Sequence, residues 1–153
     1  YGTVTQVQLV AEAVREAMEE AGIESIEDVH CVEVKCPNLT ADRIADANSR
    51  GKNVVSTNLA VAGNKSKGAS ALGVALALGE VKEEDITNDA ICSNWDLYSN
   101  VASTSAGNEQ VACRVLVMGN STKAISNFKI GSGGERVRKK LKRSIFKIKR
   151  RQD

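Results

Sequence analysis

The segment at residues 68–78 constrains the fold more than any other part of the chain. It is rich in Ala and Leu and is apolar on nearly every side at helical spacing, so it predicts a buried helix. Apolar residues make up 42% of the 153 residues, enough for a core, but aromatic residues only 3%. The core around this helix must therefore be built from Val, Ala, Leu and Ile side chains.

The remaining elements are short and alternate between helix and strand. Gly22 is placed to end a first helix, and Thr40 to cap a second one. The periodicity predicts helices at residues 5–21 and 40–49 and strands at residues 29–35, 53–56, 100–105 and 111–118. This order predicts an α+β fold with a single sheet and helices on one face. The other face then needs a cover from other copies or other domains.

Cysteine and histidine usage bears on metal and redox chemistry. None of the four cysteines forms a CxxC pair, and with one histidine a zinc site would need an unusual ligand set. We expect reduced thiols in the core of a cytoplasmic protein, with no metal and no cofactor. Neither an apolar run of transmembrane length nor a secretory leader is recognisable. Tyr1 in place of Met predicts a fragment, a processed product or a trimmed form.

Charge divides the chain into two parts. Residues 135–153 carry ten Lys or Arg and two acids, a net of +8, and because the whole chain carries +2, residues 1–134 carry −6. The GSGG run at residues 131–134 is typical of a linker, so we predict a domain at residues 1–130 and a basic amphipathic tail at 135–153. Docking of the tail on its own or a neighbouring subunit is favoured. Binding to nucleic acid or an anionic membrane, and a merely solvated tail, are the alternatives.

A serine nucleophile needs a base, and the one histidine, His30, lies in the middle of a predicted strand. That position is more typical of a structural residue than of a catalytic base. Without histidine, a serine is usually activated by a lysine held neutral by burial and by neighbouring positive charge. Lys35 ends an apolar strand just before Pro37, where catalytic side chains are common. A solvated strand end gives the same pattern.

Two further segments are candidates for a site. Ser105 lies among small residues, ASTSAG at 102–107, where the amides of Ser105 and Ala106 are candidates for an oxyanion site. An ordinary Ser/Gly turn is the alternative. Residues 64–68, NKSKG, precede the buried helix, so their amides and lysines predict an anion site at its N-terminus. Their spacing does not match the GxxxxGK[ST] phosphate loop.

Together these segments resemble the cyanuric acid hydrolase and barbiturase family. The run VEVKCPNLT at residues 32–40 resembles the family's VKCPLLT, and SKGASALGVALA at residues 66–77 resembles its SRGASALGVALA. Asn94-Trp95, followed by STSAG at residues 103–107, resembles DW…SASAG, and residues 115–121 resemble the next strand. Order and spacing also match, and the resemblance covers residues 3–130.

The resemblance implies one repeat of a chain with three α+β repeats around a pseudo-three-fold axis. Each repeat offers a Ser/Lys dyad and an Arg to a ring-shaped substrate at the centre. This chain is most similar to the second repeat, which makes Lys35 the general base, Ser105 the nucleophile, and the Ser105 and Ala106 amides the oxyanion site. Lys67 stands at the position of the substrate-binding Arg, and because Lys lacks the planar fork of Arg, substrate preference is open.

The family's first and third repeats, and the strand that opens each repeat, have no counterpart in this sequence. The leading hypothesis is therefore a Ser/Lys amidohydrolase module that opens a cyclic imide of the cyanuric acid or barbiturate type, acting only in a three-fold assembly as a homotrimer. A repeat that folds and trimerises without catalysis is the first alternative. A polyanion-binding module that works through the tail is the second.

Overall fold

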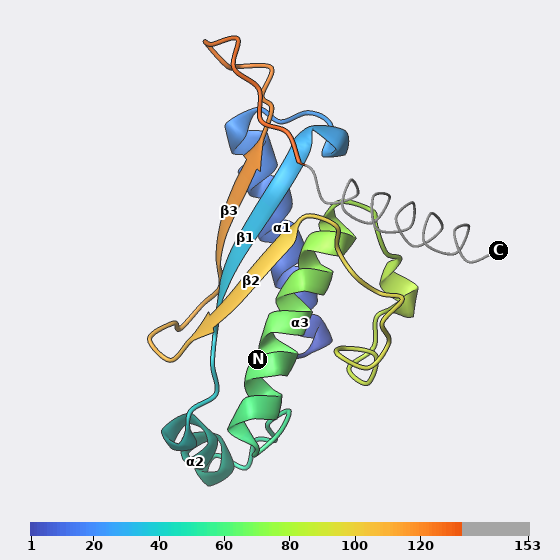
Figure 1. Ribbon diagram of the computed structural model, residues 1–153. Helices are drawn as coiled ribbons and strands as arrows, with labels where there is room; N and C mark the ends of the chain where they lie inside the picture. The colour runs from blue at the N-terminus through green and yellow to red at the C-terminus, as the bar shows by residue number, and fades with distance from the viewer. Residues whose placement is uncertain (133–153) are drawn as a thin grey trace, which may run out of the picture.

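The computed structural model describes residues 1–132, so the predicted tail at residues 135–153 lies outside the described residues. The described elements are α1 (Val4–Ala21), β1 (Val29–Pro37), α2 (Ala41–Ser49), α3 (Leu59–Ala77), β2 (Ala102–Gly107) and β3 (Arg114–Gly119). Figure 1 shows one three-stranded sheet with α1 and α3 on the same side of it. The predicted α+β fold is thus confirmed. Within residues 1–132, no helix combines the length and apolarity needed to cross a membrane.

The sheet is mixed, with β1 at its centre. β2 pairs parallel to β1 and β3 pairs antiparallel to it, in the order β2-β1-β3. Lys35 of β1 is aligned with Ser105 of β2 on one side and with Arg114 of β3 on the other. Successive side chains of a strand point to opposite faces, so these three residues share the face of the sheet that lacks helices.

The opposite face of the sheet forms the main core with the two long helices. Val32 and Val34 of β1 pack in one cluster with Val10 and Val14 of α1 and Val74 of α3. All five side chains are almost completely buried. The core is thus aliphatic, as the near absence of aromatic residues predicts.

α1 and α3 approach each other most closely at Gly73. A Cβ atom built on Gly73 would lie 2.6 Å from the Val10 Cβ and 2.7 Å from the Val7 carbonyl oxygen. Ordinary van der Waals contact begins at 3.4 Å, so a side chain does not fit here without moving a helix. The glycine therefore sets the spacing of the helical layer.

Local capping groups explain why α1 and α2 lie close to their predicted bounds. Gly22 ends α1 in the left-handed conformation, with φ at 67°, and its amide donates to the Glu19 carbonyl. Thr40 caps α2, and its hydroxyl accepts a hydrogen bond from the Arg43 amide at 3.4 Å. Both signals are readable from a few neighbouring residues.

α3 begins at Leu59, nine residues before its predicted start at Gly68. Asn58 caps it, and its side-chain oxygen accepts hydrogen bonds from the amides of Ala60 and Val61 at 3.0 and 3.2 Å. Residues 63–67 of α3 are Gly, Asn, Lys, Ser and Lys, so they interrupt the apolar pattern between the first turn and the later ones.

The predicted anion site at residues 64–68 is wrong, because these residues lie inside α3 rather than at its N-terminus. Their backbone amides serve the helix instead of an outside ligand. The Lys65 ammonium donates to the carbonyls of Asn88 and Ile91, at 3.0 and 2.5 Å. This lysine therefore fastens the loop after α3 to the helix.

The predicted strand at residues 53–56 is also wrong, because these residues form the irregular connection between α2 and α3. Both edges of β1 are already occupied by β2 and β3. Val54 and Val55 pack instead against a small cluster of Leu39, Ile44 and Ala62. The two later strands exist as predicted but begin two and three residues further along the chain, at Ala102 and Arg114.

Candidate active site

Two of the candidate residues, Lys35 and Ser105, lie on the helix-free face of the sheet, called here the open face. A depression of about 480 Å³ on this face is lined by residues of all three strands: Glu33, Lys35, Ser103, Ser105, Arg114, Val115 and Leu116. The strand register puts Lys35 beside Ser105 at the carboxyl ends of two parallel strands. The structure thus brings together two residues that lie far apart in the sequence.

Lys35 has a charged partner on the open face. Its ammonium nitrogen lies 3.4 Å from Oε1 of Glu109, in the turn after β2. The Lys35 side chain is 42% exposed and that of Glu109 63%, so solvent screens the pair. The pKa of the Glu109 carboxyl lies below its ordinary value. Hydrogen bonds from the Glu109 backbone amide and from the Gln110 side chain lower it, and Lys35 adds to the lowering.

The amides of Ser105 and Ala106 have different surroundings. The Asn38 amide donates to the Gly107 carbonyl across the parallel pair at 3.0 Å. Since backbone groups alternate along a strand, odd-numbered residues of β2 direct their amides toward β1 and even-numbered ones toward the outer edge. The register therefore points the Ser105 amide into the sheet and the Ala106 amide out of its edge.

Lys67 lies on α3 and is half-buried. Its neighbour Ser66 is fully buried and donates a hydrogen bond to the Pro37 carbonyl at 2.7 Å. This bond brings α3 to the carboxyl end of β1, the end that carries Lys35. Lys67 is not among the residues that line the depression.

His30 lies near the beginning of β1, away from Lys35. Its Nε2 is 2.9 Å from the side-chain nitrogen of Asn120, and its Nδ1 is 3.4 Å from the Ser132 hydroxyl. Asn120 in turn binds both backbone groups of Ile130. His30 thus helps to fasten the segment that follows β3.

Sequence reasoning missed four polar residues of this face. Glu33 and Ser103 lie two positions before Lys35 and Ser105, so the two-residue period of a strand was enough to find them. Arg114 and Glu109 have no such local signal. Their places depend on the register of β3 and on the turn after β2.

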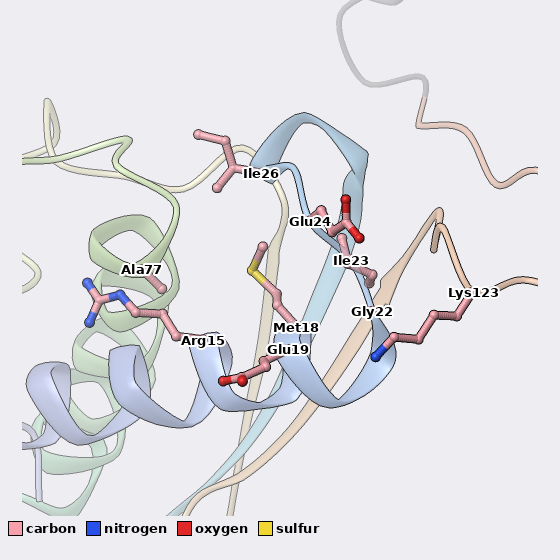
Figure 2. Close-up of a pocket in the computed structure, with 9 residues that line it drawn as sticks. All are labelled: Arg15, Met18, Glu19, Gly22, Ile23, Glu24, Ile26, Ala77 and Lys123. Atoms are coloured by element: carbon pink, nitrogen blue, oxygen red, sulfur yellow. The ribbon is translucent and has the colours of Figure 1, made fainter.

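A second depression, of about 510 Å³, lies at the C-terminal end of α1 (Figure 2). Met18, Ile23 and Ala77 supply apolar surface, and Arg15 and Lys123 are among its charged residues. None of its lining residues is Ser, Cys or His. It lies beside the turn that leads into β1, at the opposite end of that strand from Lys35, so it does not bear on the candidate chemistry.

Comparison with known proteins gives consistent matches over most of the chain. The sequence profile of a family described as amidohydrolase ring-opening protein matches residues 1–141. A cyanuric acid amidohydrolase of Enterobacter cloacae is 51% identical over 120 residues, which are 78% of this chain and 32% of the relative. A cyclic amide hydrolase of Azorhizobium caulinodans is 49% identical over 132 residues, 86% of this chain and 36% of the relative.

Solved structures match the fold as well. The crystal structure of cyanuric acid hydrolase from A. caulinodans superposes with a TM-score of 0.78 at 46% identity, covering 80% of this chain and 35% of that one. A second cyanuric acid hydrolase structure superposes with a TM-score of 0.71 at 41% identity, covering 79% and 34%. The chain therefore spans about a third of the length of the relatives it matches, consistent with one repeat.

Proposed function

The chain belongs to the family of ring-opening amidohydrolases, and we propose that it contributes a Ser/Lys site that opens a cyclic amide of the cyanuric acid type. The observation that carries this proposal is the alignment of Lys35 with Ser105 across two parallel strands, on a hollowed face. The names of the relatives supply the substrate class. A cyclic imide of the barbiturate type has the same reacting group and falls within the proposal.

The proposed reaction is acyl transfer to serine. With the open face covered and its pair with Glu109 broken, a neutral Lys35 takes the proton of the Ser105 hydroxyl while Ser105 Oγ attacks a ring carbonyl. The ring C–N bond then breaks, and the Lys35 ammonium returns the proton to the leaving nitrogen. Water hydrolyses the acyl-enzyme and releases the ring-opened product.

The surroundings of the dyad suggest how the substrate is held. The Ala106 amide donates to the oxyanion of the tetrahedral intermediate. The Ser105 amide joins it when the end of β2 shifts away from β1. Lys67 supplies a cation near the carboxyl end of β1 for a ring carbonyl. An ammonium contacts one oxygen at a time, so it selects less sharply between imide edges than a planar guanidinium does.

The proposal includes a three-fold assembly of this segment. A lysine serves as a base only where water is largely excluded, yet the Lys35 side chain is 42% exposed. Leu116, on the same face, is 56% exposed. Three copies around an axis would cover the open faces and present three sets of Lys35, Lys67 and Ser105 to one ring.

The test is the ultraviolet loss of cyanuric and barbituric acid with the parent chain and three variants. Ser105→Ala and Lys35→Ala should each lower the rate by about 10³-fold or more, because each removes a reacting group. Ser103→Ala is the matched control, since Ser103 lies on the same strand and face two residues away. It should keep a rate within a few-fold of the parent.

Sedimentation of the same samples reports assembly, and circular dichroism reports folding. A folded Ser105→Ala variant with full activity would refute the assignment of the nucleophile. A folded trimer of the parent chain without turnover of either substrate would favour the alternative of a repeat that assembles without catalysis.

A further inference from the structure

Two cysteines lie next to residues of the candidate site, one beside Lys35 and the other beside Arg114. Cys36 lies in β1 and is completely buried, and Cys113 directly precedes β3 and is half-buried. In the antiparallel pair of β1 and β3, Lys35 is aligned with Arg114. One further step in this register places Cys36 opposite Cys113.

Both thiols belong to the helix side of the sheet. Val34 and Val115, the pair two positions further into the register, both pack in the main core. Cys113 packs against the same core cluster, and the alternation of β1 turns Cys36 to the face of Val34. An independent sign of proximity is that Cys36 is among the groups that influence the pKa of the Cys113 thiol.

The antiparallel pairing of β1 with β3 favours a disulfide between Cys36 and Cys113. Even-numbered residues of β1 direct their backbone groups to β2, as the bond from the Asn38 amide to Gly107 shows. Continued one step beyond Lys35 and Arg114, where the ladder ends, the register would make Cys36 and Cys113 a non-hydrogen-bonded position. At such positions Cα atoms are about 4.5 Å apart and side chains are closest. Disulfides span Cα separations of about 4.4–6.8 Å, so a pair at this position would have the spacing that a disulfide needs.

We propose that Cys36 and Cys113 are a redox-active pair that a hydroperoxide oxidises to a cross-strand disulfide. The Cys113 thiolate attacks the peroxide O–O bond, which gives a sulfenic acid and releases an alcohol, or water from hydrogen peroxide. The Cys36 sulfur then displaces hydroxide from this sulfenic acid, and the hydroxide leaves as water with the Cys36 proton. Two thiols are thereby oxidised by two electrons, and one hydroperoxide is reduced.

The disulfide would change the surroundings of the dyad. In the reduced chain, the Cys36 thiol donates to the carbonyl oxygen of Ser105 at 3.2 Å. Oxidation removes this donor and joins β1 to the start of β3, one residue away from Lys35. This effect on activity depends on the proposed function, whereas formation of the disulfide does not.

The pH dependence of the reaction follows from burial. Desolvation raises the pKa of the Cys113 thiol, although a hydrogen bond with Ser70 opposes the shift. Cys36 adds to the rise of this pKa, and the N-terminal ammonium opposes it. The charged side chains of Glu33, Lys35 and Arg114 lie on the other side of the sheet, on the open face. Little thiolate is present at neutral pH, so oxidation should be slow there and accelerate as the pH rises.

The experiment treats the full chain with graded hydrogen peroxide, blocks the remaining thiols, and maps peptides by mass without reduction. A linked peptide containing Cys36 and Cys113 should form and disappear on treatment with dithiothreitol. Cys113→Ser should abolish it, and the matched control Cys92→Ser should retain it. Oxidation of Cys36 or Cys113 only to sulfinic acid, or links that join Cys31 or Cys92 instead, would overturn the inference.

A second readout does not involve hydrolysis. A disulfide that fits the native strands closes the long loop between residues 36 and 113, so the oxidised chain should unfold at a higher urea concentration and return to the parent midpoint on reduction. A linked chain that unfolds at a lower midpoint would show that the two cysteines are not opposed in the folded state. If either disulfide experiment fails, the proposed hydrolase function is unaffected. If the hydrolysis assay shows that Ser105 is not the nucleophile, the proposed disulfide is unaffected.

Discussion

The contact of Gly73 with α1 gives the sharpest test of how the helical layer is packed. In Gly73→Ala, the new methyl carbon would start 2.6 Å from the Val10 Cβ and 2.7 Å from the Val7 carbonyl oxygen. The Val7 oxygen is backbone and cannot rotate away, so α1 and α3 must separate by roughly 1 Å to reach normal contact. That separation also loosens Val10, Val14 and Val74 in the core between them.

The expected magnitude is a balance of two terms. Overpacking of a tight core costs about 1–3 kcal/mol, and a clash with backbone belongs at the upper end. Replacing glycine by alanine inside a helix recovers about 1 kcal/mol through helix propensity. The net loss in the free energy of unfolding should therefore be about 2 kcal/mol, or a fall of about 6 °C in the melting temperature.

Gly63→Ala is the matched control within the same helix. It gains the same propensity, but its methyl group would meet the side-chain oxygen of Asn38 at 2.9 Å, not backbone. The Asn38 side chain can give way by adjusting its exposed hydrogen bond to the Asn108 side chain. Urea unfolding followed by circular dichroism should find Gly63→Ala about as stable as the parent or up to about 1 kcal/mol more stable. If Gly73→Ala were as stable as Gly63→Ala, the close approach of α1 to α3 would be refuted.

Three further variants test other parts of the fold and the site. Gln6→Leu removes the side chain that donates to the Ser66 carbonyl and the Ser70 hydroxyl, at 2.8 and 2.9 Å. Because these buried acceptors lose their donor, the free energy of unfolding in urea should fall by about 2 kcal/mol. An unchanged urea midpoint would contradict their burial. Asn58→Ala removes the cap of α3 and should cost about 1 kcal/mol in the same assay, unless α3 begins elsewhere. The pKa of Glu109 is lower in the folded chain than its ordinary 4.5, so its stabilising effect is present above the unfolded value and is lost as the pH falls through the folded value. Glu109→Gln should therefore lose less melting temperature between about pH 5 and about pH 3 than the parent does, and parallel losses would argue against a lowered pKa of Glu109.

The sequence predicted the bounds of α1, which depend on neighbouring residues, but not the beginning of α3, which depends on contacts with residues far away in the chain. α1 was predicted to within a residue because its apolar positions repeat at helical spacing and Gly22 ends it. The first turns of α3 contain Gly63 and Asn64, which form helix poorly in isolation. They are held by the Asn58 cap and by the bond from Ser66 to Pro37, which connects segments far apart in the sequence.

The candidate site shows the same division. Lys35 and Ser105 were singled out as strand-end residues, and the resemblance to known hydrolases suggested their roles. Their alignment across β1 and β2 depends on a register that no local pattern encodes. The ion pair of Lys35 with Glu109 depends on the turn after β2, and no recognisable motif marks Glu109 in that turn. Motifs therefore predicted the identity of the pair but not its surroundings.

The central position of β1 has a consequence for the order of folding. Its neighbours arrive late in the chain, because residue 35 pairs with residues 105 and 114. Pairings between such distant segments close long loops, so they form slowly compared with helices. During synthesis, one edge of β1 stays unpaired until the ribosome has released residues beyond 107, and the other until it has released residues beyond 119. The hollow on the open face is thus among the last features to form, and a variant that weakens the pairing of β2 should lose the site while its helices persist.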